Sequence, residues 1–276
     1  MKFNSTLKFH NPAFKIAAIA FVLLSLFLSA CSTSPTGRKQ ILLFPESQMA
    51  QMGAAAYQET KKGTPISKNS KSNAYISCIA DAIVAKVEPD KAWEVTVFDS
   101  EQVNAFALPG GKIGIYTGLL SVAKNQHQLA TVIGHEIAHV TARHGNARVS
   151  ASTLTQVGLA AAQILAGSAS REKQQLLGLL GLGAQVGILL PYGRGQESES
   201  DILGLVYMAS AGFDPRQSVP LWQNMAKASG GKAPPELLST HPSNATRIAD
   251  LNKAMPDAMI IYNKARSQGE KPNCKQ

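Results

Sequence analysis

The chain has 276 residues, of which 45% are hydrophobic and 16% charged, and this composition excludes a disordered or collagen-like protein. The formal net charge is +9, but the sequence contains no basic arm and no nucleic-acid-binding motif, so we expect no nucleic-acid partner. Three cysteines without a CxxC spacing exclude a disulfide-rich scaffold and a cysteine-based zinc site.

The first 30 residues have the pattern of a lipoprotein signal peptide. Three lysines precede a run over 16–28 that is apolar except for Ser25, and such a short run is typical of a signal peptide rather than of a membrane span. The string Leu-Ser-Ala-Cys that ends at Cys31 resembles a bacterial lipobox and implies cleavage before this cysteine, with lipid attached to it. Because Ser32 follows, we expect the outer membrane as the location, with the protein facing the periplasm. A plain secreted protein is the alternative.

The next segments in chain order are polar and then alternate between helical and extended patterns. Residues 31–45 are turn-rich and suit a lipidated tether. We expect helices over 45–62 and 73–87. Strands are expected over 94–98, 103–108 and 112–116, with a Pro-Gly-Gly turn before the last of them. Thr117 is a candidate cap for a short helix, and a longer helix is expected over 126–144, with Gly145 as its stop.

The second half of the chain is predicted to be helical. Residues 154–190 are rich in Leu, Ala and Gly but are interrupted by a polar stretch at 171–175, so a helical hairpin packed on the body is expected; contact with a membrane surface is the alternative. Further helices are expected over 197–211, 219–229 and 243–255.

Two cysteines remain once Cys31 is assigned to lipid. The envelope compartment is oxidising, so Cys78 and Cys274 form a candidate disulfide that would tie the polar tail, 267–276, to the early part of the chain. The sequence leaves their pairing open.

The helix expected over 126–144 carries the motif His-Glu-Ile-Ala-His. His135 and His139 are four residues apart, so they project from one face and can bind one Zn²⁺ ion. Glu136 lies about 100° round the helix, where its carboxylate can take a proton from a zinc-bound water and pass it to the leaving amine. The alternative is a pair of hydrogen-bonded core histidines with a glutamate in a salt bridge.

A catalytic zinc site needs a third protein ligand from elsewhere in the chain. His144 lies five residues after the second histidine, so it points to a different face and is not expected to bind. A later helix offers Glu197 and Glu199, and Glu197 shares a face with Asp201. We therefore favour Glu197 as the ligand, with Asp201 orienting a ligand histidine; Glu199 is the alternative, and a solvated acidic helix start is the interpretation without a metal.

Together these motifs resemble the HtpX-like and CAAX-prenyl-protease family of zinc metallopeptidases. The matching strings lie, in chain order, at 104–111, 115–119, 135–144, 194–201 with Gly204, and His241-Pro242 with Arg247. The resemblance is closest to the periplasmic lipoprotein members and to mitochondrial OMA-type proteases. It implies an α+β fold over 46–266: a mainly helical, zincin-like (gluzincin) metalloprotease domain with a small β-sheet beside the metal-binding helix.

The resemblance also implies roles for individual residues. One Zn²⁺ ion per chain would be bound by His135, His139 and Glu197, with Glu136 as general base and acid and Asp201 behind a ligand.

Two later residues have alternative roles in this resemblance. Arg247 would support the tetrahedral intermediate or the helix that carries Glu197. His241 has three interpretations: a latch that occupies the fourth position of the metal, a hydrogen-bond donor to the transition state, or a plain loop histidine.

The expected activity is endoproteolysis of unfolded or misassembled envelope polypeptides. The strand expected over 103–108, with Asn104, Ala105 and Phe106, is a candidate edge for an extended substrate. The membrane, through lipid on Cys31, and the outer-membrane assembly machinery are further expected partners. The alternatives are a chaperone-like assembly lipoprotein with a latched, mostly inactive zinc site, and a structural lipoprotein without a metal.

Overall fold

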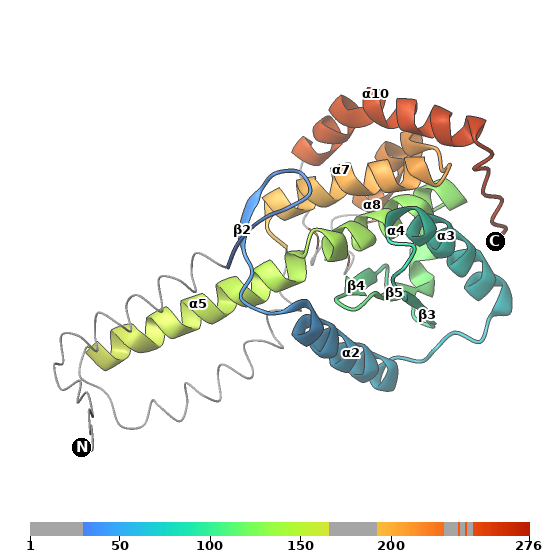
Figure 1. Cartoon of the computed structure of the whole chain (residues 1–276). Helices are drawn as coiled ribbons and strands as arrows, with labels where there is room; N and C mark the ends of the chain where they lie inside the picture. Colours follow the sequence, from blue (N-terminus) through green and yellow to red (C-terminus); the bar gives the residue numbers. More distant parts are fainter. Residues whose placement is uncertain (1–29, 166–191, 229–236, 238–240, 242–244) are drawn as a thin grey trace, which may run out of the picture.

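The computed structural model describes residues 30–165, 192–228, 237, 241 and 245–276, without the side chains of 159–165 and 245. Helices surround a small sheet, which confirms the expected α+β class (Figure 1). The long helices are α2 (Glu46–Gly63), α3 (Ser70–Val87), α4 (Gln126–Thr141), α5 (His144–Leu165), α7 (Arg194–Ser210), α8 (Ser218–Ala228) and α10 (Ala245–Ser267). The strands are β1 (Cys31–Thr33), β2 (Lys39–Ile41), β3 (Glu94–Phe98), β4 (Ala105–Leu108) and β5 (Lys112–Tyr116), and short 3-10 turns cover Thr117–Ser121 and Pro215–Gln217.

The central sheet has the order β3-β5-β4, with β3 parallel and β4 antiparallel to β5. This order leaves β4 at an edge. Gly114 of β5 lies opposite Phe106 of β4, and a Cβ on Gly114 would come 2.2 Å from the ring of Phe106. The absence of a side chain on this glycine therefore lets the Phe106 ring lie across the sheet.

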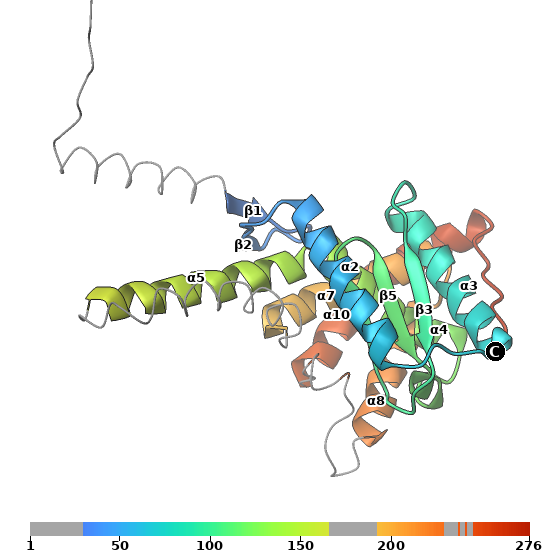
Figure 2. The ribbon, with the colours of Figure 1, turned by 90° about the horizontal axis from the view of Figure 1, so that it is seen from below.

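The two faces of the sheet are buried by different helices. Ile113 and Ile115 alternate inward and join the main core, which they share with residues of α3 and α4. Phe98 and Tyr116 belong to a second cluster with α2, which covers the opposite face (Figure 2). Each such side chain contributes about 1.5–3 kcal/mol when fully buried. The sheet is therefore fixed between α2 and the layer that contains α4.

Helix α4 ends earlier than the sequence predicted. Gly145 was the expected stop after a helix to residue 144, but α4 ends at Thr141 and Gly145 lies inside α5. The turn occurs at Arg143, whose φ of 57° lies in the left-handed region that non-glycine residues rarely adopt. No glycine marks this break, so the sequence pattern placed it wrongly.

Two other local predictions also differ from the structure. Thr117 does not cap the 3-10 turn: its Oγ1 accepts from the backbone N–H of Ser100 at 3.0 Å and donates to the Ser100 carbonyl at 2.9 Å. The last helix continues through Pro256 to Ser267 instead of ending near 255. Pro256 lies on the exposed side of α10, where water can bond the carbonyl that the proline frees.

The predicted hairpin over 154–190 lies mostly outside the described residues. Its first part belongs to α5, which extends away from the body of the molecule as far as Leu165 (Figures 1 and 2). Within the described part of the chain, no helix combines the length and apolar character needed to cross a bilayer.

The segment predicted as a tether folds back on the body. β1 and β2 pair as an antiparallel hairpin. The Gln40 amide donates to the carbonyl of Ala142 at 3.1 Å, and the backbone N–H of Leu43 donates to Ser150 at 2.9 Å. These bonds hold the hairpin against the α4–α5 junction.

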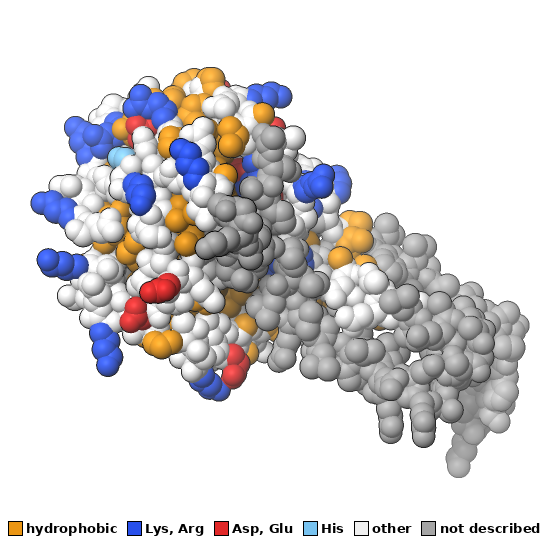
Figure 3. Space-filling model, turned by 180° about the vertical axis from the view of Figure 1, so that it is seen from behind, with side chains coloured by type: hydrophobic (Ala, Val, Ile, Leu, Met, Phe, Trp, Pro, Cys, Tyr) orange, Lys and Arg blue, Asp and Glu red, His pale blue; other side chains and the backbone are white. Residues whose placement is uncertain are grey.

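The surface carries its charge in a dispersed form. Figure 3 shows Lys and Arg side chains scattered over the described part of one face, with few acidic side chains among them. Because the charges are separated, this face has no concentrated basic patch among the residues it shows.

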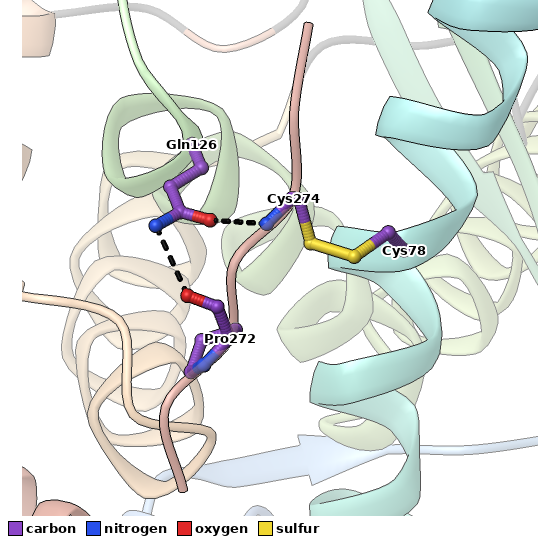
Figure 4. The surroundings of a disulfide bond; sticks show 4 residues. All are labelled: Cys78, Gln126, Pro272 and Cys274. Atoms are coloured by element: carbon purple, nitrogen blue, oxygen red, sulfur yellow. Dashed lines mark hydrogen bonds between the residues drawn. A yellow bond between two sulfur atoms is a disulfide. The ribbon is translucent and has the colours of Figure 1, made fainter.

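The end of the chain is tied to α3 by a disulfide. Cys78 and Cys274 are bonded across a sequence separation of 196, with their Cα atoms 5.8 Å apart. Gln126 at the start of α4 also holds the tail, because its side chain accepts from the Cys274 N–H at 2.9 Å and donates to the Pro272 carbonyl at 3.1 Å (Figure 4). The polar tail is therefore anchored to both α3 and α4.

Candidate metal centre

Helices α4 and α7 approach each other closely at two glycines. A Cβ on Gly204 would lie 2.7 Å from the backbone nitrogen of His135, and a Cβ on Gly134 would lie 2.8 Å from the Gly204 carbonyl oxygen. A side chain at either position would push the helices apart. This contact places the first turn of α7, with Glu197, opposite the two histidines of α4.

Four buried side chains converge at this crossing. The ligand atoms of His135, His139, Glu197 and His241 all lie within 4.8 Å of one another. The two Nε2 atoms of the helix histidines are 3.1 Å apart, and each is 3.4 Å from an oxygen of Glu197. His241 Nδ1 lies 3.1 Å from Glu197 Oε1. The cluster therefore contains the three predicted ligands and His241.

The residues of this cluster fit a zinc ion. Imidazole and carboxylate are the ligands of catalytic zinc sites. Glu136 is buried beside the cluster, with Oε2 accepting from the Ala107 N–H at 3.2 Å, while Oε1 accepts no hydrogen bond from any described residue. This second oxygen lies 3.4 Å from His241 Nε2, so it faces the cluster.

The ring of His135 is held from behind by an ion pair. Asp201 Oδ1 lies 3.0 Å from His135 Nδ1. Arg247 donates to both oxygens of Asp201 at 2.6 Å, and its Nη1 lies 2.9 Å from Glu197 Oε2. The guanidinium of Arg247 also packs 4.0 Å from the centre of the Trp222 ring. Arg247 therefore links Asp201, which supports the ligand His135, to Glu197, which is itself a ligand.

The charges of the cluster shift its protonation strongly. Burial disfavours the charged ring of His135, but hydrogen bonds to Asp201 and Glu197 raise its pKa to about 9. Burial holds the pKa of His139 well below its ordinary value. Burial opposes ionisation of Glu197, yet hydrogen bonds from the surrounding histidines lower its pKa far below the usual range. Burial raises the pKa of Glu136. The ionised Glu197 thus lies beside Glu136, whose raised pKa favours the protonated form.

Tyr192 is a site residue that the sequence did not indicate. Its ring stacks on His139 with the centroids 3.6 Å apart, and the guanidinium of Arg148 lies 3.5 Å from the centre of the same ring. Burial raises the pKa of Tyr192 to about 12. No motif marks this tyrosine, and only the tertiary contact identifies it.

A small pocket lies beside β4 and reaches the cluster at His139. Its walls include His139, Ala107, Leu108, Arg148 and Tyr192. One member of the cluster, His139, therefore lines the same pocket as two residues of β4.

The predicted substrate strand lies at this edge. Asn104 precedes β4 and accepts from the Tyr116 N–H, Ala105 is buried in β4, and Phe106 packs against the ring of Tyr57. The backbone N–H that faces Glu136 belongs to Ala107. Pairing with a substrate remains a prediction for this strand, and the structure adds Ala107 to it.

The comparisons with known proteins agree with this geometry. The model of peptidase family M48 matches residues 50–255. The chain belongs to this peptidase family. The match confirms the resemblance to zinc metallopeptidases, and it confirms zinc as the expected cofactor of the cluster.

Among its M48 relatives, the chain is 37% identical over 192 residues to the mitochondrial metalloendopeptidase OMA1 of Schizosaccharomyces pombe, covering 67% of this chain and 54% of the relative. It is 27% identical over 261 residues to human OMA1, covering 89% and 50%. It is 29% identical over 210 residues to the beta-barrel assembly-enhancing protease of Escherichia coli, covering 74% and 43%. The chain thus spans about half the length of these relatives.

Proposed function

We propose that this chain is a zinc-dependent endopeptidase that hydrolyses unfolded or misassembled proteins of the bacterial envelope. One observation carries the proposal: Glu136 lies beside the cluster of His135, His139 and Glu197, with one oxygen bonded to the backbone of the edge strand β4 and the other facing the cluster. A general base, a set of metal ligands and a strand that can hold a polypeptide therefore lie together.

The residues divide the chemistry between them. A zinc ion bound here would polarise a peptide carbonyl and make a water acidic enough to lose a proton near neutral pH. The Ala107 N–H fixes one oxygen of Glu136, and the other faces the cluster, where it can accept that proton. Because burial raises the pKa of Glu136, the carboxylate can return the proton to the leaving amine. Arg247 balances the negative charges of Glu197 and Asp201.

The substrate is expected to bind as an extended strand along β4. One edge of β4 pairs with β5, and the Ala107 N–H on the other edge faces Glu136. Main-chain pairing tolerates many side chains, which suits unfolded polypeptides. The Escherichia coli relative is named for β-barrel assembly, and this supports misassembled outer-membrane proteins, and contact with their assembly machinery, as parts of the proposal.

The proposed location is the outer membrane, through lipid on Cys31, with the domain in the periplasm. The lipobox supports this, and Cys31 is exposed and outside the disulfide at the first residue of β1. The Cys78–Cys274 bond fits an oxidising compartment. Cells labelled with a fatty acid should incorporate the label into the wild type and not into Cys31→Ala, which should leave the outer-membrane fraction. Equal labelling of both would refute the anchor.

Cleavage of unfolded casein tests the activity directly. We expect the zinc-loaded wild type to cleave it, a chelator to stop the cleavage, and Glu136→Gln to lose at least about a hundredfold in rate, because a glutamine cannot accept the proton. The variant should still bind one zinc ion per chain. Cleavage by Glu136→Gln at the wild-type rate would overturn the proposed role of this glutamate.

His241 favours a second candidate function, a chaperone-like assembly lipoprotein whose site is latched. His241 is the fourth member of the cluster, and its Nε2 lies 3.4 Å from Glu136 Oε1, where it can occupy the position that a substrate needs. For a latch, His241→Ala should raise the rate of casein cleavage, and Glu136→Gln should rescue the deletion phenotype. A slower His241→Ala enzyme would instead identify His241 as a catalytic donor.

A further inference from the structure

The second zinc-facing histidine has its own chain of buried partners. His139 Nδ1, the nitrogen that faces away from the cluster, lies 2.9 Å from His144 Nδ1. His144 Nε2 then lies 3.1 Å from Glu199 Oε2. His144 is fully buried, and Glu199 is 5% exposed. The chain Glu199–His144–His139 is thus shielded from water along its length.

The left-handed turn at Arg143 creates this contact. On a continuous helix a residue five positions further along would point about 140° away from His139. The helix instead breaks at Arg143, with φ 57°, and the His144 ring turns back toward His139. Non-glycine residues rarely adopt this left-handed conformation, because it brings the Cβ atom close to the backbone. The surrounding structure therefore maintains an unfavourable backbone conformation at the residue that brings His144 into place.

The hydrogen positions follow from the direction of His139. With its Nε2 turned to the cluster, His139 carries its proton on Nδ1 and donates it to His144 Nδ1. His144 must then carry its own proton on Nε2, from which it donates to Glu199. Such partners fix the orientation of a metal-binding ring and raise its basicity.

The carboxylate at the end of this chain is held by the amino-terminal hairpin. Arg38 Nε donates to Glu199 Oε2 at 2.7 Å, and Thr36 Oγ1 donates to Glu199 Oε1 at 2.7 Å. Both donors lie in the turn between β1 and β2, a few residues after Cys31. The segment next to the proposed anchor thus contacts the carboxylate that supports a zinc ligand.

We propose that Glu199 and His144 are positioning residues for His139, and that Arg38 and Thr36 couple the amino-terminal hairpin to the zinc affinity of the site. The arrangement mirrors the support of His135 by Asp201 and Arg247. The inference rests on the zinc site of the proposed function, but it requires no turnover.

Zinc affinity measured in the inactive Glu136→Gln background tests the inference. Competition with a chromogenic chelator gives the Kd, and the visible absorption of the Co²⁺-loaded protein reports the geometry around the metal. We expect Glu199→Gln and His144→Phe to weaken zinc binding about tenfold to a hundredfold and to shift the Co²⁺ spectrum. Arg38→Gln should act in the same direction by less, and Arg38→Lys should restore part of the affinity.

Matched controls separate positioning from general damage. Glu94 lies on β3, the edge strand opposite β4, and pairs with Lys112 at 2.8 Å, while Arg216 pairs with Asp214 at 2.6 Å on the surface. Glu94→Gln and Arg216→Gln should change neither the Kd nor the spectrum. In a His144→Phe background, Arg38→Gln should have no further effect on the Kd, because the connection to His139 is already broken.

Three results would overturn the inference. The first is a Kd within twofold of the parent for both Glu199→Gln and Arg38→Gln. The second is an Arg38→Gln effect that persists in full when His144 is Phe. The third is a loss of thermal stability without a change in Kd or spectrum, which would assign these residues to the fold alone. If the wild type fails to cleave casein while these variants change the zinc Kd as expected, only the proposed endopeptidase is refuted.

Discussion

At the scale of single residues, the centre depends on how its buried charges are paired. Arg247 is 1% exposed and is surrounded by the carboxylates of Asp201 and Glu197. Two anions and one cation are stable in such a place only with close, hydrogen-bonded pairing. The guanidinium therefore has a structural role as well as any role toward substrate.

Replacing Arg247 by methionine tests this pairing. The change leaves two buried carboxylates without their cation, so we expect the metal-free protein to lose about 3–5 kcal/mol of unfolding free energy, measured by urea denaturation. Arg216→Met, which removes an exposed ion pair, is the matched control and should change stability little. Equal, small effects of the two changes would show that the buried pair contributes no more than a surface pair.

The half-buried His127 predicts a pH dependence of stability. Burial lowers the pKa of His127, and its Nδ1 accepts the backbone N–H of Asp214 at 3.1 Å, a bond that protonation would break. The unfolded chain therefore binds this proton first as the pH falls below about 6.5, and the free energy of unfolding decreases. The contribution is fully present above pH 6.5.

Urea denaturation at pH 7.5 and 5.5 measures this effect. We expect a smaller loss of stability on acidification in His127→Gln than in the wild type, because the variant lacks the titrating ring. The same loss in both proteins would assign the pH dependence to other groups.

At the scale of elements, the crossing of α4 and α7 decides whether the ligands meet. The two helices carry His135 and Glu197 on facing sides, and the glycines at 134 and 204 let their backbones touch. The edge strand β4 contacts α4 from another direction and brings the Ala107 N–H to Glu136. The site is thus formed by the packing of two helices and one strand against each other.

Gly204→Ala should separate these two helices. The new methyl would lie 2.7 Å from the His135 nitrogen, so we expect a loss of about 1–3 kcal/mol from overpacking and weaker zinc binding. Thermal unfolding and chelator competition measure the two effects. Gly158→Ala is the control, because its Cβ meets nothing within 4 Å; it should be neutral or stabilising by about 0.5–1 kcal/mol. Wild-type affinity in Gly204→Ala would contradict the importance of this contact.

At the scale of the whole molecule, the disulfide links the end of the chain to an early helix. Cys78 of α3 and Cys274 of the tail enclose most of the domain, including every residue of the metal cluster. The hairpin over β1 and β2 adds a second clasp at the α4–α5 junction. The ends of the described chain thus both contact the body that holds the site.

Removing the disulfide should lower global stability. We expect the double variant Cys78→Ser, Cys274→Ser to lose about 2–5 kcal/mol of unfolding free energy, measured by denaturant unfolding under oxidising conditions. A reducing agent should destabilise the wild type to a similar extent and leave the double variant unchanged. No difference between oxidised and reduced wild type would show that the bond does not contribute.

The local parts of the fold followed from sequence patterns. Strands were predicted over 94–98 and 112–116, and β3 and β5 have these bounds. Alternation and flanking turn residues are local signals, so the sequence alone predicts these strands. The left-handed turn at Arg143 was missed because no glycine or asparagine marks it. The helix expected over 243–255 was too short, because α10 continues through Pro256, which is tolerated on an exposed helix face.

The sequence by itself determined the metal-binding pair and its base, because the pitch of one helix places His135, Glu136 and His139 without help from the rest of the chain. Only the tertiary structure decided what completes the site. His241 lies 106 residues from His135, and the contacts of Tyr192 and of Glu199 cross between separate elements. Such contacts depend on how whole helices pack, and the spacing of residues along the chain does not encode that packing.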